Sequence, residues 1–239
     1  MGGNKMGARM NKWGFFFLVV VLLSGVSFLS PCPDYYCNLI QLTEAPAWSA
    51  ELASGGQKIS KTGIPYAADT PSAGSEEIYK AILARRGGKL ANLDRMLLNS
   101  PAFAQGWNEM FGAIRGKLAV SLKLRELAIV TIAVMNKADY EWQAHAPLFL
   151  TAGGNQEQLN AIKKGVLDAI KNPKLFDESE RATLALTYEM TRNVTVKKDT
   201  MAKIRSLLPT QQVVELIGTI AGYNMVSRFL IATGIDPEE

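Results

Sequence analysis

A single histidine, His145, stands among the 239 residues of the chain, together with only two cysteines, Cys32 and Cys37. This scarcity excludes the H-E-x-x-H zinc motif, and neither cysteine belongs to a C-x-x-C motif. The sequence also lacks a glycine-rich phosphate-binding loop and a G-x-S-x-G nucleophile elbow. A Ser-His-Asp triad needs only one histidine, but no pattern marks its serine. Most common enzyme signatures are therefore absent.

Excess positive charge is small and unevenly placed. The formal net charge is +4, and Lys5, Arg9 and Lys12 all precede the first acid, Asp34. The rest of the chain is nearly neutral, so it lacks the broad basic surface that nucleic acids require. We therefore expect no nucleic-acid partner.

Residues 1–30 have the pattern of an export signal. The three basic residues precede an apolar run from Trp13 to Leu29, in which small residues Ser24, Gly25 and Ser27 follow the most apolar part. This order is typical of a signal peptide. The run is short for a membrane span, which needs roughly 20 apolar residues, although an uncleaved anchor remains an alternative. We expect an exported protein, periplasmic or secreted, that touches a membrane only through this segment if it is uncleaved.

Residues 31–74 show no sustained helical period and contain several prolines and glycines, which predicts an irregular linker or arm. Cys32 and Cys37 lie in this segment. In an oxidising compartment they could form a disulfide loop, or they could remain unpaired. Two cysteines give too little pattern to choose between these alternatives.

From residue 75 to residue 239, helix start and stop signals are frequent, and no alternating strand pattern competes with them. Capping boxes are predicted at Asn155 with Gln158 and at Asp177 with Glu180. Other helix starts are predicted at N-caps Ser75, Ser100 (followed by Pro101), Asp139 and Thr210, and helix ends are predicted at Gly87 and Gly234. The segment that opens at Ser121 is apolar on more than one face, which is typical of a central buried helix. We therefore predict an all-α domain over residues 75–239, with helices over residues 75–86, 90–98, from 100, 121–136, 139–152, from 155, from 177 and 210–231.

Two acidic residues are predicted to lie near the single histidine. Glu141 and His145 are four residues apart on one predicted helix and therefore share a face. Glu126 lies on the preceding helix, and an antiparallel helical hairpin could bring it beside the same imidazole. Carboxylates orient an imidazole and raise its basicity, so this pattern indicates a proton-transfer site. An exposed helix pair with no catalytic role is the plainer interpretation.

The stretches that carry these residues resemble a known family. Leu124-Arg125-Glu126-Leu127-Ala128-Ile129, the later Tyr140-Glu141-Trp142-Gln143-Ala144-His145, and the C-terminal Tyr223-Asn224-Met225-Val226-Ser227-Arg228 are similar to segments of the carboxymuconolactone decarboxylase family, in the alkylhydroperoxidase D-like superfamily. The similarity covers residues 75–239. It implies an alkylhydroperoxidase D-like helical fold, assembly into a homo-oligomeric trimer or hexamer, and sites near subunit contacts.

The resemblance also bears on redox chemistry. Redox members carry two cysteines on the helix that bears the histidine, and these positions fall at Ala138 and Glu141. A dithiol peroxidase needs a thiolate and a resolving thiol, which neither residue supplies. Peroxiredoxin-type activity is therefore not expected, and the resemblance instead implies decarboxylase-like chemistry without a cofactor.

The resemblance assigns roles to several residues. His145 is expected to be the general acid or base, with Glu141 or Glu126 orienting it. Arg125 is expected to bind a substrate carboxylate, although a structural ion pair explains it equally well. Substrate contacts are further expected from two aromatic residues, which could instead belong to the core, and from two polar residues of the last helix: Tyr140, Trp142, Asn224 and Arg228.

The resulting expectation is a lyase or isomerase that acts on a small carboxylated or lactone-like molecule. One alternative is a metal-dependent or peroxidase-type oxidoreductase, with Glu126, Glu141 and His145 as possible metal ligands. Another is a non-catalytic exported oligomer that binds a small ligand or a partner protein. A cavity beside His145 would favour an enzyme over this last alternative.

Overall fold

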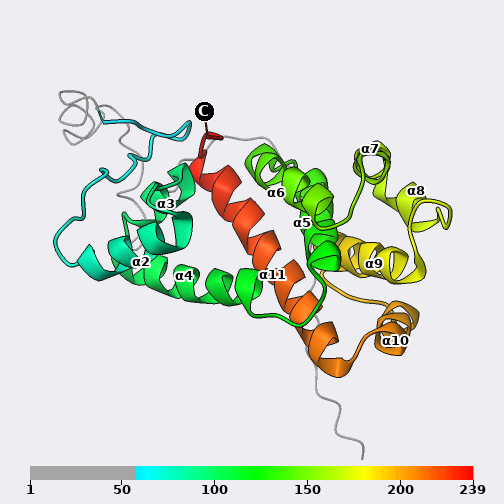
Figure 1. Cartoon of the computed structure of the whole chain (residues 1–239). Coiled ribbons are helices and arrows are strands. Elements are labelled where there is room, and N and C mark those ends of the chain that lie inside the picture. Colours follow the sequence, from blue (N-terminus) through cyan, green and yellow to red (C-terminus); the bar gives the residue numbers. More distant parts are fainter. Residues whose placement is uncertain (1–56, 239) are drawn as a thin grey trace, which may run out of the picture. The chain divides into compact units, whose positions relative to one another are not determined.

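The computed structural model describes residues 57–238, and the chain is helical over most of this range (Figure 1). The only extended pairing among these residues is an isolated bridge between Ile59 and Pro65. The prediction of an all-α fold is therefore confirmed. The predicted export segment and both cysteines lie outside the described residues. Among residues 57–238, no helix is both long and apolar enough to cross a membrane.

The first helices are α2 (Glu76–Arg86), α3 (Asn92–Leu97) and α4 (Pro101–Gly116). Helix α2 ends at Gly87, whose positive φ of 71° suits glycine. Helix α4 begins with Pro101, as the Ser-Pro pair predicted. Helix α3 lies between α2 and α4 in the sequence. Its Asp94 is buried and forms ion pairs with two arginines at the end of α2, Arg85 and Arg86.

Helix α5 (Leu122–Asn136) forms the centre of the domain and packs mainly against α6, α9 and α11. Every residue from Leu124 to Ala133 is buried, which confirms the prediction of a central helix. The Ser121 hydroxyl accepts a hydrogen bond from the Leu124 amide at 3.3 Å and caps the first turn. Helices α5 and α6 (Asp139–Thr151) form the predicted hairpin.

The predicted N-cap of α6 was wrong by one residue, and two helices were not predicted. Ala138, and not the predicted Asp139, is the N-cap of α6. Asp139 lies in the first helical turn, where its negative charge interacts favourably with the helix dipole. Helices α8 (Val166–Ile170) and α10 (Lys198–Leu207) were not predicted. Neither has a capping side chain, so no sequence signal marks where they begin.

Both predicted capping boxes are present, at the starts of α7 (Gln156–Lys164) and α9 (Glu178–Asn193). The last helix, α11 (Thr210–Thr233), ends at Gly234, as predicted, but its N-cap is Pro209 instead of Thr210. Helix α11 contacts α4 as well as α5 and α6 (Figure 1). Helices α4, α5, α6 and α11 therefore meet, and their facing side chains form the candidate site.

Candidate active site

The centre of the site is a buried pair between two adjacent helices. His145 on α6 and Glu126 on α5 are joined by a hydrogen bond of 2.7 Å between Nδ1 and Oε2. Their side chains are only 5% and 7% exposed, respectively. Because a carboxylate can only accept, it favours the tautomer in which Nδ1 carries the proton. Nε2 then has a free lone pair, and no described residue hydrogen-bonds to it.

The pKa of His145 lies below its ordinary value, mainly because the side chain is buried. The Glu126 carboxylate raises this pKa, whereas the nearby Arg115 and Arg86 guanidinium groups lower it further. The imidazole is therefore neutral near neutral pH, which is the form that a general base needs. Glu126 is placed to stabilise the imidazolium that forms when the base takes up a proton.

Two further side chains complete the surroundings of the imidazole. The Tyr223 ring of α11 meets the His145 ring edge-on, with 5.0 Å between the centroids. Arg115, near the end of α4, donates a hydrogen bond from Nε to the Tyr223 hydroxyl at 3.1 Å. No motif of the sequence contains Arg115, and Tyr223 belongs only to the family-like stretch from Tyr223 to Arg228. Tyr223 therefore contacts both the imidazole and a guanidinium.

A cavity of about 270 Å³ opens beside this group. Its lining combines two arginines, several apolar side chains and the Glu126–His145 pair. Such a cavity is of a size to take a small molecule. Its lining consists of Arg86, Arg115, Leu122, Glu126, Ala144, His145, Leu148 and Thr151.

Glu141 does not pair with His145, contrary to the expectation from their spacing. The Ser227 hydroxyl of α11 donates a hydrogen bond to Glu141 Oε2, and Oε1 has no partner among the described residues. Burial raises the pKa of Glu141 to about 8. The two residues do share a helix face, but each finds a different partner, and Glu141 does not line the cavity.

Arg125 also lies away from the cavity lining. Its guanidinium Nη1 donates hydrogen bonds to the backbone carbonyls of Ile114 and Arg115. These carbonyls belong to the last turn of α4, where backbone acceptors lack partners within the helix. Arg125 therefore has a structural role in place of the predicted substrate contact. Its partners are backbone carbonyls, whereas the alternative interpretation was a structural ion pair.

The two predicted aromatic contacts lie elsewhere. The Tyr140 hydroxyl donates to Glu238 Oε1 at 2.8 Å. The Trp142 ring packs partly against the core, with the Lys163 amine 4.1 Å from its centroid. Neither residue lines the cavity.

The two predicted residues of α11 are bonded to each other. Arg228 Nη1 donates to the Asn224 side-chain oxygen at 3.0 Å and to its backbone carbonyl. The Asn224 amide nitrogen donates to Thr191 on α9 at 2.9 Å. The residue of α11 that approaches the site is instead Tyr223, which lies on a different face of the helix from its neighbour Asn224.

The arrangement does not assemble the predicted metal ligands. No group of three or more His, Cys, Asp or Glu residues suited to a metal ion occurs within residues 57–238. Of the predicted set, Glu126 and His145 meet, whereas Glu141 bonds to Ser227. The two positions that carry thiols in redox relatives hold Ala138 and Glu141, both buried.

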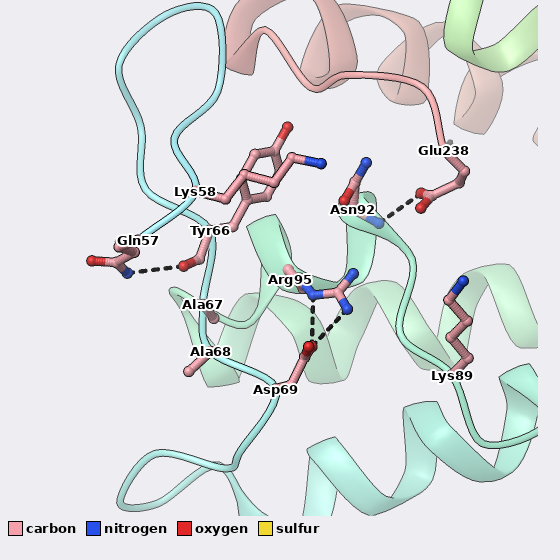
Figure 2. Close-up of a pocket in the computed structure, with 10 residues that line it drawn as sticks. All are labelled: Gln57, Lys58, Tyr66, Ala67, Ala68, Asp69, Lys89, Asn92, Arg95 and Glu238. Carbon is pink, nitrogen blue, oxygen red and sulfur yellow. Dashed lines mark hydrogen bonds and ion pairs between the residues drawn. The ribbon is translucent and has the colours of Figure 1, made fainter. Parts of the chain in front are cut away.

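A second, larger cavity of about 640 Å³ lies between the 57–69 segment, α3 and Glu238 (Figure 2). Its arginine and its two acidic residues already have partners within the chain. Arg95 binds the Asp69 carboxylate through Nε at 2.7 Å, and Glu238 accepts from the Asn92 amide at 2.7 Å (Figure 2). No histidine, cysteine, serine or threonine lines this cavity, so it lacks the imidazole–carboxylate pair of the His145 site.

Comparison with known proteins agrees with the helical fold and with the family resemblance. Residues 101–175 match the model of the carboxymuconolactone decarboxylase family. This segment contains Arg115, Glu126 and His145, whereas Tyr223 lies beyond it. No curated protein matches the chain.

Solved structures with the same fold are distant in sequence. An uncharacterized peroxidase-related protein from Silicibacter sp. TM1040 is 19% identical, with a TM-score of 0.60 over 77% of this chain and 96% of its own. A peroxidase-related protein from Ralstonia eutropha JMP134, described as an alkylhydroperoxidase AhpD core, is 15% identical, with a TM-score of 0.59 over 69% and 86% of the two chains. A debrominase solved with 2,3,4-tribromopyrrole is 14% identical, with a TM-score of 0.59 over 71% and 89%.

The predicted resemblance is thus confirmed: the chain carries the sequence pattern of the carboxymuconolactone decarboxylase family across residues 101–175, within a fold that it shares with alkylhydroperoxidase D-like proteins.

Proposed function

We propose that the protein is a cofactor-free enzyme that transfers a proton at a carbon atom of a small carboxylated or lactone-like molecule, in a decarboxylation or an isomerisation. His145 is the general acid and base. The observation that carries this proposal is the buried Glu126–His145 pair, 2.7 Å apart, at the edge of a cavity of about 270 Å³.

In an isomerisation, Nε2 of the neutral His145 removes a proton from a carbon next to a carbonyl, and the electron pair moves into that carbonyl. Glu126 stabilises the resulting imidazolium through Nδ1. The imidazolium then returns the proton to a different carbon, so the atoms and charges balance.

In a decarboxylation, the bond from carbon to the carboxylate breaks and carbon dioxide leaves. The electron pair that remains on carbon takes a proton from the His145 imidazolium. The neutral imidazole then regains a proton from a hydronium ion of the solvent, so each turnover consumes one proton. Burial disfavours the imidazolium in the free protein. An anion bound near the imidazole counteracts this effect, because opposite charges favour the charged form. Substrate binding would therefore prepare His145 to donate.

The other predicted functions have less support. A dithiol peroxidase would need thiols where Ala138 and Glu141 stand. A metal-dependent enzyme would need Glu141 to leave Ser227 and join Glu126 and His145. A purely structural role for His145 is disfavoured because the imidazole adjoins a cavity. The debrominase was solved with a small ring compound, which is consistent with a ligand of that size in this fold.

The setting of the reaction rests on sequence alone. The export pattern of residues 1–30 supports a periplasmic or secreted enzyme, or one anchored by that segment. The family resemblance supports a homo-oligomer, either a trimer or a hexamer. Such an enzyme would meet substrates outside the cytoplasm.

The test is turnover of a panel of lactones and keto acids by the wild-type protein and by His145→Ala. General acid-base catalysis contributes roughly 10²- to 10⁴-fold to a rate, so a loss of that size is expected. Lys58→Ala is the matched control, because Lys58 lies in the second cavity and should leave turnover unchanged. Turnover that survives in a folded His145→Ala protein would remove His145 from the mechanism.

A further inference from the structure

Arg115 carries a positive charge that has no ion-pair partner among residues 57–238. Within residues 57–238, no carboxylate lies within ion-pair distance of its guanidinium, and its one side-chain partner is the Tyr223 hydroxyl. The other arginine of the cavity differs, because Arg86 is ion-paired with Asp94 at 2.8 Å, a carboxylate that it shares with Arg85. The cavity therefore holds one arginine that has a carboxylate partner and one that has none.

The remaining donors of Arg115 are available to a ligand. A guanidinium has five N–H groups, and only the one on Nε is used in a side-chain hydrogen bond. Arg115 is partly buried and lines the same cavity as His145. Partly buried charges are costly unless they are paired, and the planar fork of a guanidinium matches a carboxylate in two parallel hydrogen bonds.

The walls of the cavity define the rest of the ligand. Leu122 and Leu148 line it although their side chains are 46% and 47% exposed, respectively. Apolar groups that face a cavity favour an apolar body, such as a ring, over a second charge. The volume of about 270 Å³ restricts this body to a small molecule.

Tyr223 holds Arg115 and His145 in a fixed relation. Its ring packs edge-on against the imidazole, and its hydroxyl accepts from Arg115. Tyr223 is fully buried and does not line the cavity, so it acts through the other two groups. A rigid tyrosine between an anchor and a base fixes the distance between the group that is bound and the carbon that reacts.

We propose that Arg115 binds the carboxylate of the substrate, that Tyr223 is its positioning residue, and that the substrate class is small apolar monocarboxylates. This inference rests on the proposed function, since it names the substrate class of the same site. It also makes a claim about binding alone, which is measured without turnover.

The experiment uses benzoate as a probe and benzamide as its neutral isostere, with binding measured by calorimetry in a buffer free of carboxylates. Wild-type protein is expected to bind benzoate more tightly than benzamide. Arg115→Gln is expected to weaken benzoate on the order of 10- to 100-fold, the range for a hydrogen-bonded charge, and to leave benzamide unchanged. Arg115→Lys keeps the charge and is expected to retain part of the preference for benzoate.

Two further variants separate the claims. Tyr223→Phe should weaken benzoate but not benzamide, whereas a purely structural effect would weaken both. His145→Ala should lose turnover yet still bind benzoate. If His145→Ala keeps its turnover, the proton-transfer function fails while the carboxylate site stands.

His145 provides an independent signal, because it is the only histidine of the chain and its imidazole resonances cannot be confused with others. The groups that face it are Glu126, Arg115, Arg86 and Tyr223. Benzoate on Arg115 is expected to raise the pKa of His145 in the wild type and not in Arg115→Gln. Equal binding of benzoate and benzamide, or an undiminished benzoate affinity in folded Arg115→Gln, would overturn the proposal.

Discussion

Replacing Glu126 with glutamine isolates the charge of the buried pair. Glutamine has nearly the same shape and its side-chain oxygen still accepts from His145 Nδ1, so the neutral imidazole keeps its hydrogen bond. The imidazolium, however, loses a carboxylate 2.7 Å away. Because both side chains are at most 7% exposed, water screens this interaction little.

The size of the effect follows from the kind of bond that is lost. Hydrogen bonds to charged groups contribute about 1.5–3 kcal/mol net. Losing that amount from the imidazolium alone lowers the imidazolium-to-imidazole ratio roughly 10- to 100-fold at a given pH. The pKa of His145, already lowered by burial, should fall further in Glu126→Gln. Turnover should fall by a similar factor if the imidazolium forms during the reaction.

Nitrogen-15 NMR of the side chain measures this directly, since one histidine gives one titration curve. The matched control is Glu180→Gln, because Glu180 is also buried and hydrogen-bonded but bonds to Gln158 and Lys123 away from the site. It should leave the His145 titration unchanged. A His145 pKa that stays the same or rises in folded Glu126→Gln would show that the carboxylate does not stabilise the imidazolium, and the proposed role of Glu126 would be wrong.

Two other predictions concern stability. Burial raises the pKa of Glu141 to about 8 from 4.5, so the folded state binds the carboxyl proton more tightly than the unfolded state does. The protonated carboxyl therefore contributes to the stability of the folded state at low pH, and this contribution is lost as the pH rises through about 8. Glu141→Gln cannot ionise, so its melting temperature relative to wild type should increase between pH 7 and pH 9; a constant difference would contradict a buried neutral carboxyl. In Gly154→Ala, the new Cβ would overlap the Phe149 ring, which is fully buried, and unfolding free energy should fall by about 1–3 kcal/mol. Gly112→Ala, in the interior of α4 with open space around its Cβ, should instead be neutral or slightly stabilising by thermal denaturation.

The sequence predicted the helices best where side chains begin or end them. The capping boxes that start at Asn155 and Asp177 are both present, and α2 and α11 end at the predicted glycines, Gly87 and Gly234. These signals are local, because a cap interacts with backbone groups only two or three residues away. Helices α8 and α10 lack such side chains, and their place in the fold depends on packing against α9, which a local pattern does not reveal.

The site was predicted in part. The Glu126–His145 contact required only the assumption that α5 and α6 form a hairpin, and the structure places the two side chains together. The roles of Glu141 and Tyr140 depended on which helix covers each face of α6. Glu141 faces Ser227 on α11, and Tyr140 reaches Glu238 near the end of the chain. These partners lie 86 and 98 residues away, so sequence spacing carries no information about them.

Arg125 and Arg115 carry the same charge but have different roles in the structure. Arg125 stands next to Glu126 in the sequence, and that position suggested a role in the site. In the folded chain its guanidinium Nη1 donates to the free carbonyls at the end of α4, and Arg125 does not line the cavity. Arg115 belongs to that same last turn of α4, and its side chain points the other way, to Tyr223 and the cavity. By holding this turn in place, Arg125 supports the position of Arg115. Arg125, which was predicted to bind the substrate, therefore contributes to the site indirectly, through its hydrogen bonds to the backbone of the turn that carries Arg115.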